Sequence, residues 1–302
     1  MPTVDLSLLP APNVIEPLNY EVILNTLIEE YISLYPADQQ PAVRAAVSLE
    51  SDPVRKILQT AAYRELVLRQ RVNDAALACM LAYATGTDLD NLAANFNVLR
   101  QVIRPADPAT IPPTPAVMES DSDLRKRTQQ AFEGLSVAGP TAAYEFYARS
   151  ADGRVADVKA FSPSPACVTV TVLSRDGDGT ADQRLLDSVT AALNDEDTRP
   201  VADRVTVQSA EIVNYSVVAT IYHSPGPEAD PIRQAALANL QNYIAAQHRI
   251  GRGVYLSAID AALSVEGVVH VEITEPKANL VLSKSQASWC TNPQITLAVI
   301  ND

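Results

Sequence analysis

The chain has 302 residues, with 36 Asp or Glu against 23 Lys or Arg, so its formal net charge is −13 at pH 7. Hydrophobic residues make up 47% and charged residues 20%, a composition typical of globular proteins, and the length suffices for about two domains. This acidity argues against nucleic-acid binding and against docking on an anionic membrane, because both need clustered Lys and Arg side chains.

The first predicted element is a helix within residues 17–36. Its apolar side chains recur at steps of three and four residues, which places them on one face. A helix with a single apolar face needs a partner to cover that face. The residues of this face that we select as candidate contacts are Tyr20, Leu24, Leu27 and Tyr31.

A longer helix is predicted over residues 53–85. It begins after Asp52, a capping residue followed by a proline, and Gly86 is expected to end it. Steps of four and three residues from Val54 follow an apolar stripe that only Glu65 interrupts. The candidate contacts on this stripe are Val54, Leu58, Ala61, Leu68 and Val72.

Two interpretations of these helices stay open. A heptad-like stripe that contains small residues favours close packing against a helix of another subunit. The same stripe is equally consistent with a hairpin inside the chain, in which the helix over residues 53–85 packs against the helix within residues 17–36. The pattern alone favours neither arrangement.

A proline-rich segment is expected to end the helical region. The run RPADPATIPPTP holds five prolines, and proline fits neither a helix interior nor a central strand. We therefore assign residues 1–103 to a helical domain and residues 104–118 to a stiff connector. Two helices are predicted after the connector, in SDSDLRKRTQQAFEGL and in AAYEFYARSA.

The pattern changes to strands from residue 154 onward. The runs VADVKAF and CVTVTVLS alternate apolar and polar side chains, and a further strand is predicted over residues 204–213. Between the last two strands lies a helical pattern, ADQRLLDSVTAALND, with Thr180 and Gln183 as its predicted cap. These elements predict a ββαβ module within residues 119–213.

A second module with a similar order is predicted over residues 214–302. It comprises a strand at residues 216–223, helices at 232–247 and 256–263, and strands in VVHVEIT, NLVLS and ITLAVI. The predicted fold class is therefore multidomain α+β, in which a helical N-terminal domain precedes two consecutive α+β modules with mixed sheets.

No motif points to catalysis or to a bound cofactor. The three histidines are scattered, and GxSxG, HExxH and SxxK elements are absent. The run from Asp176 to Asp182 places oxygens at alternate residues, as Ca²⁺ prefers, but Ala181 stands where such a loop needs glycine. A turn before a capped helix is the simpler explanation. We expect no catalytic, cofactor-binding or metal-binding residues.

Cysteine usage and hydropathy bear on the compartment. Cys79, Cys167 and Cys290 lie far apart, so they predict neither a disulfide framework nor a zinc site. The longest apolar runs fall short of the roughly 18 residues that span a bilayer, and the first residues lack the pattern of a secretory signal. The chain is expected to be a soluble protein made in a reducing cytoplasm.

Three segments, in this order, resemble the baseplate J-like family of contractile-tailed phages. The first is GTDLDNLAANFNVLR at Gly86–Arg100, and the second runs from Glu119 to Val158 and contains AGPTAAYEFYA. The third is IGRGVYLSAIDAALSVEGVVHVEITEP at Ile250–Pro276. The resemblance extends over nearly the whole chain.

This resemblance implies a structural part of the baseplate wedge, the unit repeated six times around the tail hub. It implies a homodimer within a six-fold ring, and helical bundling with wedge proteins that resemble the I and W proteins of P2-like phages. It carries over no catalytic residue and no cofactor. The implied location is the baseplate of a virion or tail-like particle, assembled in the host cytoplasm.

Two other functions provide alternatives. A tail-associated cell-wall hydrolase would need a cleft with paired carboxylates, which sequence cannot reveal. A sugar-binding module at the tail periphery would be expected to show surface aromatics, but aromatic residues make up only 5% of this chain.

Overall fold

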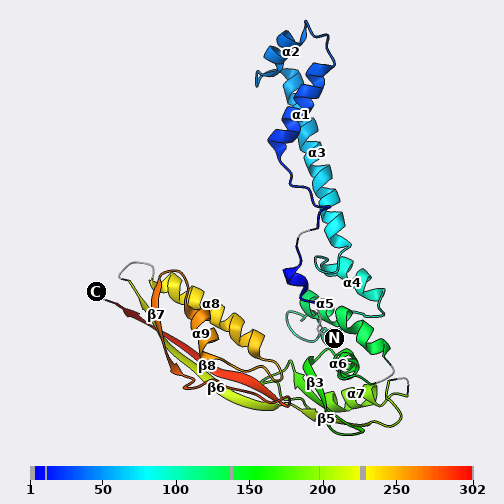
Figure 1. The fold of residues 1–302 in the computed structure, drawn as a ribbon, viewed down its shortest axis with the longest axis vertical. Coiled ribbons are helices and arrows are strands. Elements are labelled where there is room, and N and C mark those ends of the chain that lie inside the picture. Colours follow the sequence, from blue (N-terminus) through cyan, green and yellow to red (C-terminus); the bar gives the residue numbers. More distant parts are fainter. Residues whose placement is uncertain (1–3, 11, 137–138, 197, 225–228, 301–302) are drawn as a thin grey trace. The chain divides into compact units, whose positions relative to one another are not determined.

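The computed structural model describes residues 4–10, 12–136, 139–196, 198–224 and 229–300. Its contacts divide the chain into two compact units, Pro2–Asn95 and Phe96–Asp302. The described residues of the first unit form helices and turns, whereas those of the second combine helices with small sheets (Figure 1).

The unit Pro2–Asn95 is a helical hairpin with additions at both ends. After the short turn η1 (Leu6–Leu8), its helices are α1 (Tyr20–Ser33), α2 (Gln40–Val47), α3 (Pro53–Ala78) and α4 (Gly86–Ala94). Helix α1 lies along the first half of α3, and α2 forms the connection between them (Figure 1).

Local caps explain where the two long helices begin. The Asn19 side chain accepts hydrogen bonds from the Glu21 and Val22 amides, and Asp52 accepts them from Val54 and Arg55. Each cap satisfies amides that have no partner within their own helix. The start of α3 is therefore where the sequence predicted it.

The predicted end of α3 is wrong. The helix ends at Ala78 instead of residue 85, and the chain then folds into tight turns in which Met80 donates to Leu77 at 3.0 Å and Tyr83 donates to Met80 at 2.9 Å. These turns bury Ala84. Gly86, at φ +53°, has the left-handed conformation expected of it, but it begins α4 instead of ending α3.

The proline-rich segment is folded back on itself. Strands β1 (Val102–Arg104) and β2 (Val117–Met118) pair across its ends, and Asp107 and Thr114 exchange two backbone hydrogen bonds at 2.9 and 3.0 Å. The expectation of a stiff spacer is therefore wrong, because the prolines interrupt the ladder without preventing the chain from reversing.

The first α+β module follows helices α5 (Asp121–Gln130) and α6 (Thr141–Ala151), which are joined through the turn η2 (Ala131–Leu135). Its sheet has the order β3-β4-β5, with β3 antiparallel and β5 parallel to β4. Helix α7 makes the crossover between β4 and β5. The strands and this helix are β3 (Val155–Ser164), β4 (Cys167–Ser174), α7 (Gln183–Leu193) and β5 (Arg204–Ser209).

The second module is a three-stranded sheet covered by two helices. Its order is β7-β6-β8, with β7 antiparallel and β8 parallel to β6. Alternate residues of β6 from Tyr215 to Ile221 are buried against α8 and α9. The elements are β6 (Glu211–His223), α8 (Ala229–Gln247), α9 (Leu256–Leu263), β7 (Val268–Glu275) and β8 (Gln286–Val299).

These elements confirm the predicted fold class, since helices precede two α+β modules and each three-stranded sheet is mixed. Three strand assignments are corrected. The strand predicted over 204–213 is broken at Ala210, and β8 begins at Gln286, nine residues before the predicted ITLAVI. NLVLS is not a strand, because within it only Leu280 pairs, in an isolated bridge with Val254.

The break at Ala210 is where the two modules share a core. Ala210 is buried with Leu173 of the first module and with Ile250 and Ala287 of the second. The Ile250 amide donates to Asp157 Oδ2 at 2.9 Å, and Arg249 Nη1 donates to the Ala156 carbonyl at 3.0 Å. The modules are therefore joined by packing and hydrogen bonds as well as by the chain.

Candidate interaction surface

One face of α3 is covered by α1. Leu24 of α1 and Ala62 of α3 are buried at the centre of this contact, and Leu58 and Leu66 pack around them. Side chains at these positions of α3 lie above one another because they are separated by four residues. The hairpin between the two helices, one of the two open interpretations, is thus present inside the chain.

The same face of α3 is covered further along by the segment before α1. The buried Asn73 donates from Nδ2 to the Glu16 carbonyl at 2.9 Å and accepts from the Glu16 amide at 3.2 Å. Tyr83 donates from its hydroxyl to the Pro10 carbonyl at 3.2 Å. The cover of this face therefore extends beyond α1 into the segment that precedes Tyr20.

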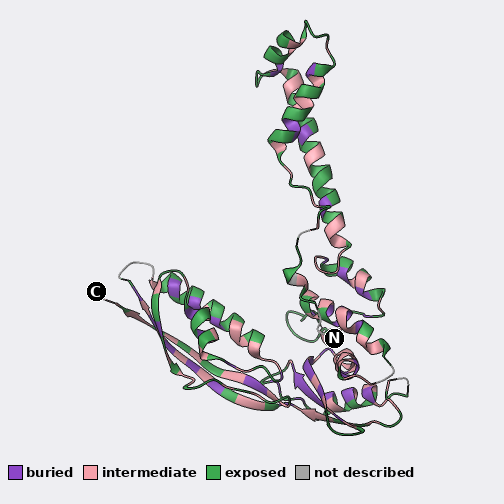
Figure 2. Ribbon diagram, viewed as in Figure 1, coloured by how far each residue is buried: buried purple, intermediate pink, exposed green. Residues whose placement is uncertain are grey.

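A second row of apolar side chains on α3 is left open. At about 100° per residue, its members fall within roughly 60° of one another around the helix axis. Ile57, Leu68 and Val72 have exposed fractions of 65%, 67% and 62%, and Figure 2 shows exposed residues along much of α3. This row, called the α3 stripe below, consists of Ile57, Ala61, Leu68, Val72 and Ala75 of α3 and of Cys79, the residue directly after it.

The structure divides the nine predicted contact residues between these faces. Those in the contact between α1 and α3 are Tyr20, Leu24, Leu27 and Leu58. Those on the open stripe are Ala61, Leu68 and Val72. Tyr31 and Val54 are half-buried, and the Tyr31 hydroxyl lies 2.8 Å from that of Tyr35.

Ion pairs hold the α2 end of the hairpin. Arg44 of α2 binds Glu29 of α1 through both guanidinium ends, one of them at 2.7 Å, and the hydrogen bond from Arg44 lowers the pKa of Glu29. Arg55 pairs with Glu50 at 2.6 Å and lowers its pKa in the same way. The Arg44–Glu29 pair is exposed on both sides and contributes little to stability, whereas in the second pair Glu50 is exposed and Arg55 is largely buried.

Two features of this surface were not predicted from the sequence. Ile57 belongs to the α3 stripe, but steps of four and three from Val54 pass over it. Asn73 appeared as an ordinary polar residue, and only contact with a segment 57 positions away gives it a role. The doubled apolar positions Ile57 and Leu58 were the available signal, since a helix with two apolar faces shows such neighbours.

The acidic loop considered for calcium is a turn and a helix cap. Gly177 and Gly179 have φ of +61° and +99°, and Asp178 accepts the Thr180 amide at 3.0 Å, a hydrogen bond that lowers the Asp178 pKa. Asp182 accepts the Leu185 amide at 2.7 Å and caps α7, so the predicted Thr180 cap is wrong.

Two further kinds of site are absent from the part of the chain that the structure describes. No group of three or more His, Cys, Asp or Glu side chains there is placed to hold a metal ion. None of the helices in the described ranges combines the length and apolarity needed to cross a membrane.

Comparison with known proteins gives matches along most of the chain. The Baseplate J-like N-terminal domain matches residues 50–107, the central domain residues 136–209 and the C-terminal domain residues 215–292. Baseplate protein J of Escherichia phage P2 is 60% identical over 295 residues, which cover 98% of this chain and 98% of that protein.

Proposed function

This chain belongs to the baseplate J-like family of structural proteins of phage-tail baseplates, and from that premise we propose that it links baseplate wedges into a ring around the tail hub. In this proposal the chain associates with a second copy of itself within a six-fold ring. It also binds adjacent wedge proteins resembling the I and W proteins of P2-like phages. In this proposal the baseplate is assembled in the host cytoplasm.

The α3 stripe is the observation that carries the proposal. Covering a Leu or Val side chain contributes about 1.5–3 kcal/mol, and the stripe leaves Leu68 and Val72 open on a helix whose opposite side is already packed. Positions 61, 68, 72, 75 and 79 follow the steps of a heptad seam, in which Glu65 occupies the position between 61 and 68. We therefore assign this stripe to a helical bundle with a neighbouring wedge protein.

Charged substitutions on the stripe test this assignment. Leu68→Asp with Val72→Asp should weaken co-assembly with the wedge partner roughly 100-fold or more, because each carboxylate would be buried without a counter-charge. Sedimentation or pull-down titration measures the affinity. Cys79 provides a second readout, since maleimide should label it quickly in the free chain and slowly in the complex.

Val67→Asp is the matched control. Val67 is also an exposed apolar residue of α3, but it lies about 100° around the helix axis from Leu68 and is not part of the α3 stripe. Its substitution should leave the affinity within about twofold of the wild type. Normal binding by the stripe variant, or equal loss in both proteins, would contradict the bundle.

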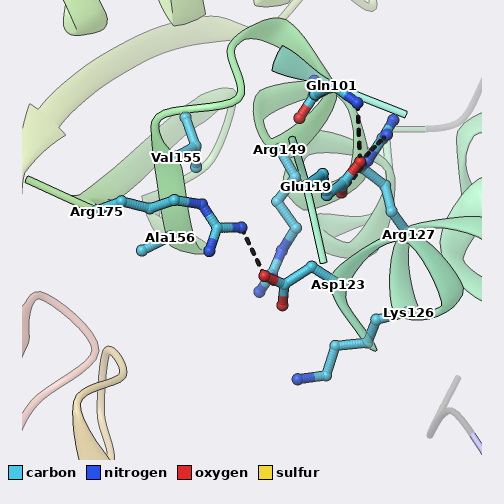
Figure 3. A pocket seen from close by; sticks show the side chains of 9 residues that line it. All are labelled: Gln101, Glu119, Asp123, Lys126, Arg127, Arg149, Val155, Ala156 and Arg175. Carbon is cyan, nitrogen blue, oxygen red and sulfur yellow. Dashed lines mark hydrogen bonds and ion pairs between the residues drawn. The ribbon is translucent and has the colours of Figure 1, made fainter. Parts of the chain in front are cut away.

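We propose no catalytic role for the chain. The family match is to structural baseplate proteins, and in the described residues the buried ion pairs Arg127–Glu119 (Figure 3) and Arg149–Asp157 join carboxylates to arginines instead of to each other. Release of soluble fragments from purified peptidoglycan by the isolated chain would overturn this part of the proposal.

A further inference from the structure

Strand β8 is an edge of the sheet in the second module, and its first half is closed on the side that faces away from β6. The sheet order is β7-β6-β8, so β6 pairs with only one side of β8 (Figure 1). On the other side, the Gln286 carbonyl accepts from the Gly251 amide at 2.8 Å, and the Ser288 carbonyl lies 2.6 Å from Nδ1 of His248. The segment before α9 therefore covers the edge at the start of β8.

The second half of β8 leaves its outward groups open. The Ile300 amide donates to the His223 carbonyl of β6 at 3.1 Å, and the backbone groups of a strand point to opposite sides at alternate residues. Ile295, Leu297 and Val299 therefore point their N–H and C=O groups away from β6. Among the described residues, none pairs with these groups. We call the segment from Ile295 to Val299 the open edge.

Pro293 marks the limit of the open edge. It lies two residues before Ile295, so its backbone nitrogen points away from β6, where a proline loses no hydrogen bond of the ladder. Proline on an edge strand is one of the features that prevent another strand from pairing there. The open edge contains neither a proline nor a lysine, so its unpaired groups are a template for a further strand.

The distribution of charge favours a second copy of this chain as the occupant. The chain has a net charge of −13, but none of the 14 residues of β8 is charged. Two copies can therefore bring these strands together without opposing carboxylates. The other edge strand, β7, carries Glu272 and Glu275, and pairing two copies along it would place like charges across the strands, which is destabilising.

We propose that the open edge pairs antiparallel with the open edge of a second copy, which joins the two sheets into one. This inference rests on the proposed self-association and names the surface that carries it. A two-fold axis at Leu297 places Leu297 opposite its own copy and Ile295 opposite Val299. In this register every outward N–H and C=O group of the three residues has a partner. Ile295 and Leu297 already pack against the core of the second module, so the pairing also brings the two cores together.

Hydrogen exchange of the full chain, resolved to single amides, tests the pairing. The amides of Ile295, Leu297 and Val299 should exchange roughly tenfold or more slowly in the dimer at high concentration than in the dilute monomer. The amides of Thr296 and Ala298 point toward β6, so their exchange should not depend on concentration. Fast exchange of the outward amides in a dimer would overturn the proposal.

Val299→Pro tests the same contact by removing one outward N–H group. The Val299 side chain is 48% exposed and its N–H lies outside the ladder with β6, so the fold should be retained, as it is at Pro293. The dissociation constant of the dimer, measured by sedimentation, should rise about tenfold or more, because each copy loses a hydrogen bond and the proline ring enters the interface. Val299→Ala keeps the N–H and should remain within about twofold of the wild type.

The outcomes separate this proposal from the proposed function. A dimer that Val299→Pro weakens no more than Val299→Ala would overturn the pairing of the open edge and leave self-association to another surface. If the chain alone is monomeric and a wedge protein slows the exchange of the outward amides, that protein occupies the open edge and the second copy does not. Binding through the α3 stripe is measured with other variants, so its failure would not affect these results.

Discussion

Tyr144 shows how a single buried hydroxyl ties stability to pH. Its side chain is packed in the core of the first module, and its hydroxyl donates to Asp203 Oδ2 at 2.7 Å. Burial, and then this hydrogen bond, raise the pKa of Tyr144. The folded chain therefore keeps the proton at pH values at which the unfolded phenol, with a pKa of about 10, has lost it. The resulting stabilisation is complete below pH ~10 and is lost as the pH rises further.

Tyr144→Phe removes the titrating group. Above pH ~10 the free energy of unfolding should fall less steeply with pH than in the wild type, by up to about 1.4 kcal/mol per pH unit. At neutral pH the variant should be less stable by about 1 kcal/mol, because the hydrogen bond to Asp203 is lost. Urea unfolding followed by circular dichroism measures both effects, and identical slopes would contradict the assignment.

Residue roles that depend on distant contacts could not be predicted from the sequence. Nothing near Asn73 in the sequence indicates that its amide group binds Glu16, and nothing near Ile250 indicates that its amide binds Asp157.

At the scale of elements, the start of α3 was more predictable than its end. Asp52 and Pro53 specify the first turn of α3 through short-range hydrogen bonds and a fixed φ. The end at Ala78 depends on turns that bury Ala84, and no residue near Ala78 is a strong helix breaker. The start of β8 was predicted too far along the chain for the same reason, because the first half of this strand gains its conformation from pairing with β6.

Asp52→Ala tests the capping of α3. Loss of the side-chain acceptor for the Val54 and Arg55 amides should destabilise the hairpin by about 1 kcal/mol. Hydrogen exchange of the amides in the first half of α3 should then accelerate about fivefold. Asp52→Asn retains an acceptor and is the control, so equal acceleration in both variants would show that the cap has no such role.

At the scale of the molecule, the two α+β modules were predicted as separate pieces, whereas the structure joins them at a shared core. The predicted strand over 204–213 ran through Ala210, since the sequence there stays apolar enough to continue. What interrupts the strand is the packing of Ala210 against Ile250 and Ala287, residues 40 and 77 positions further along. Local sequence patterns cannot predict contacts between residues so far apart in the chain.

Ile250→Ala tests the coupling of the modules. Truncation of this buried side chain should cost about 2–5 kcal/mol, and hydrogen exchange should accelerate in β4 of the first module as well as in β6 of the second. Ile259→Ala, which removes a buried side chain from the second module alone, should affect the β4 amides less. Unchanged β4 exchange in the Ile250 variant would show that the modules are independent.

Because β8 pairs with β6, the sheet of the second module can form only late in synthesis, long after the hairpin of α1 and α3. The thirteen register pairs of these strands run from Glu211 with Gln286 to His223 with Val299, so their sheet stays incomplete until the ribosome has added residue 299. The hairpin of α1 and α3 needs nothing beyond Ala78. At 5–20 residues per second, roughly ten seconds or more of translation lie between the two events. In a nascent chain, the hairpin of α1 and α3 is therefore available to other subunits before the sheet of β6, β7 and β8 has formed.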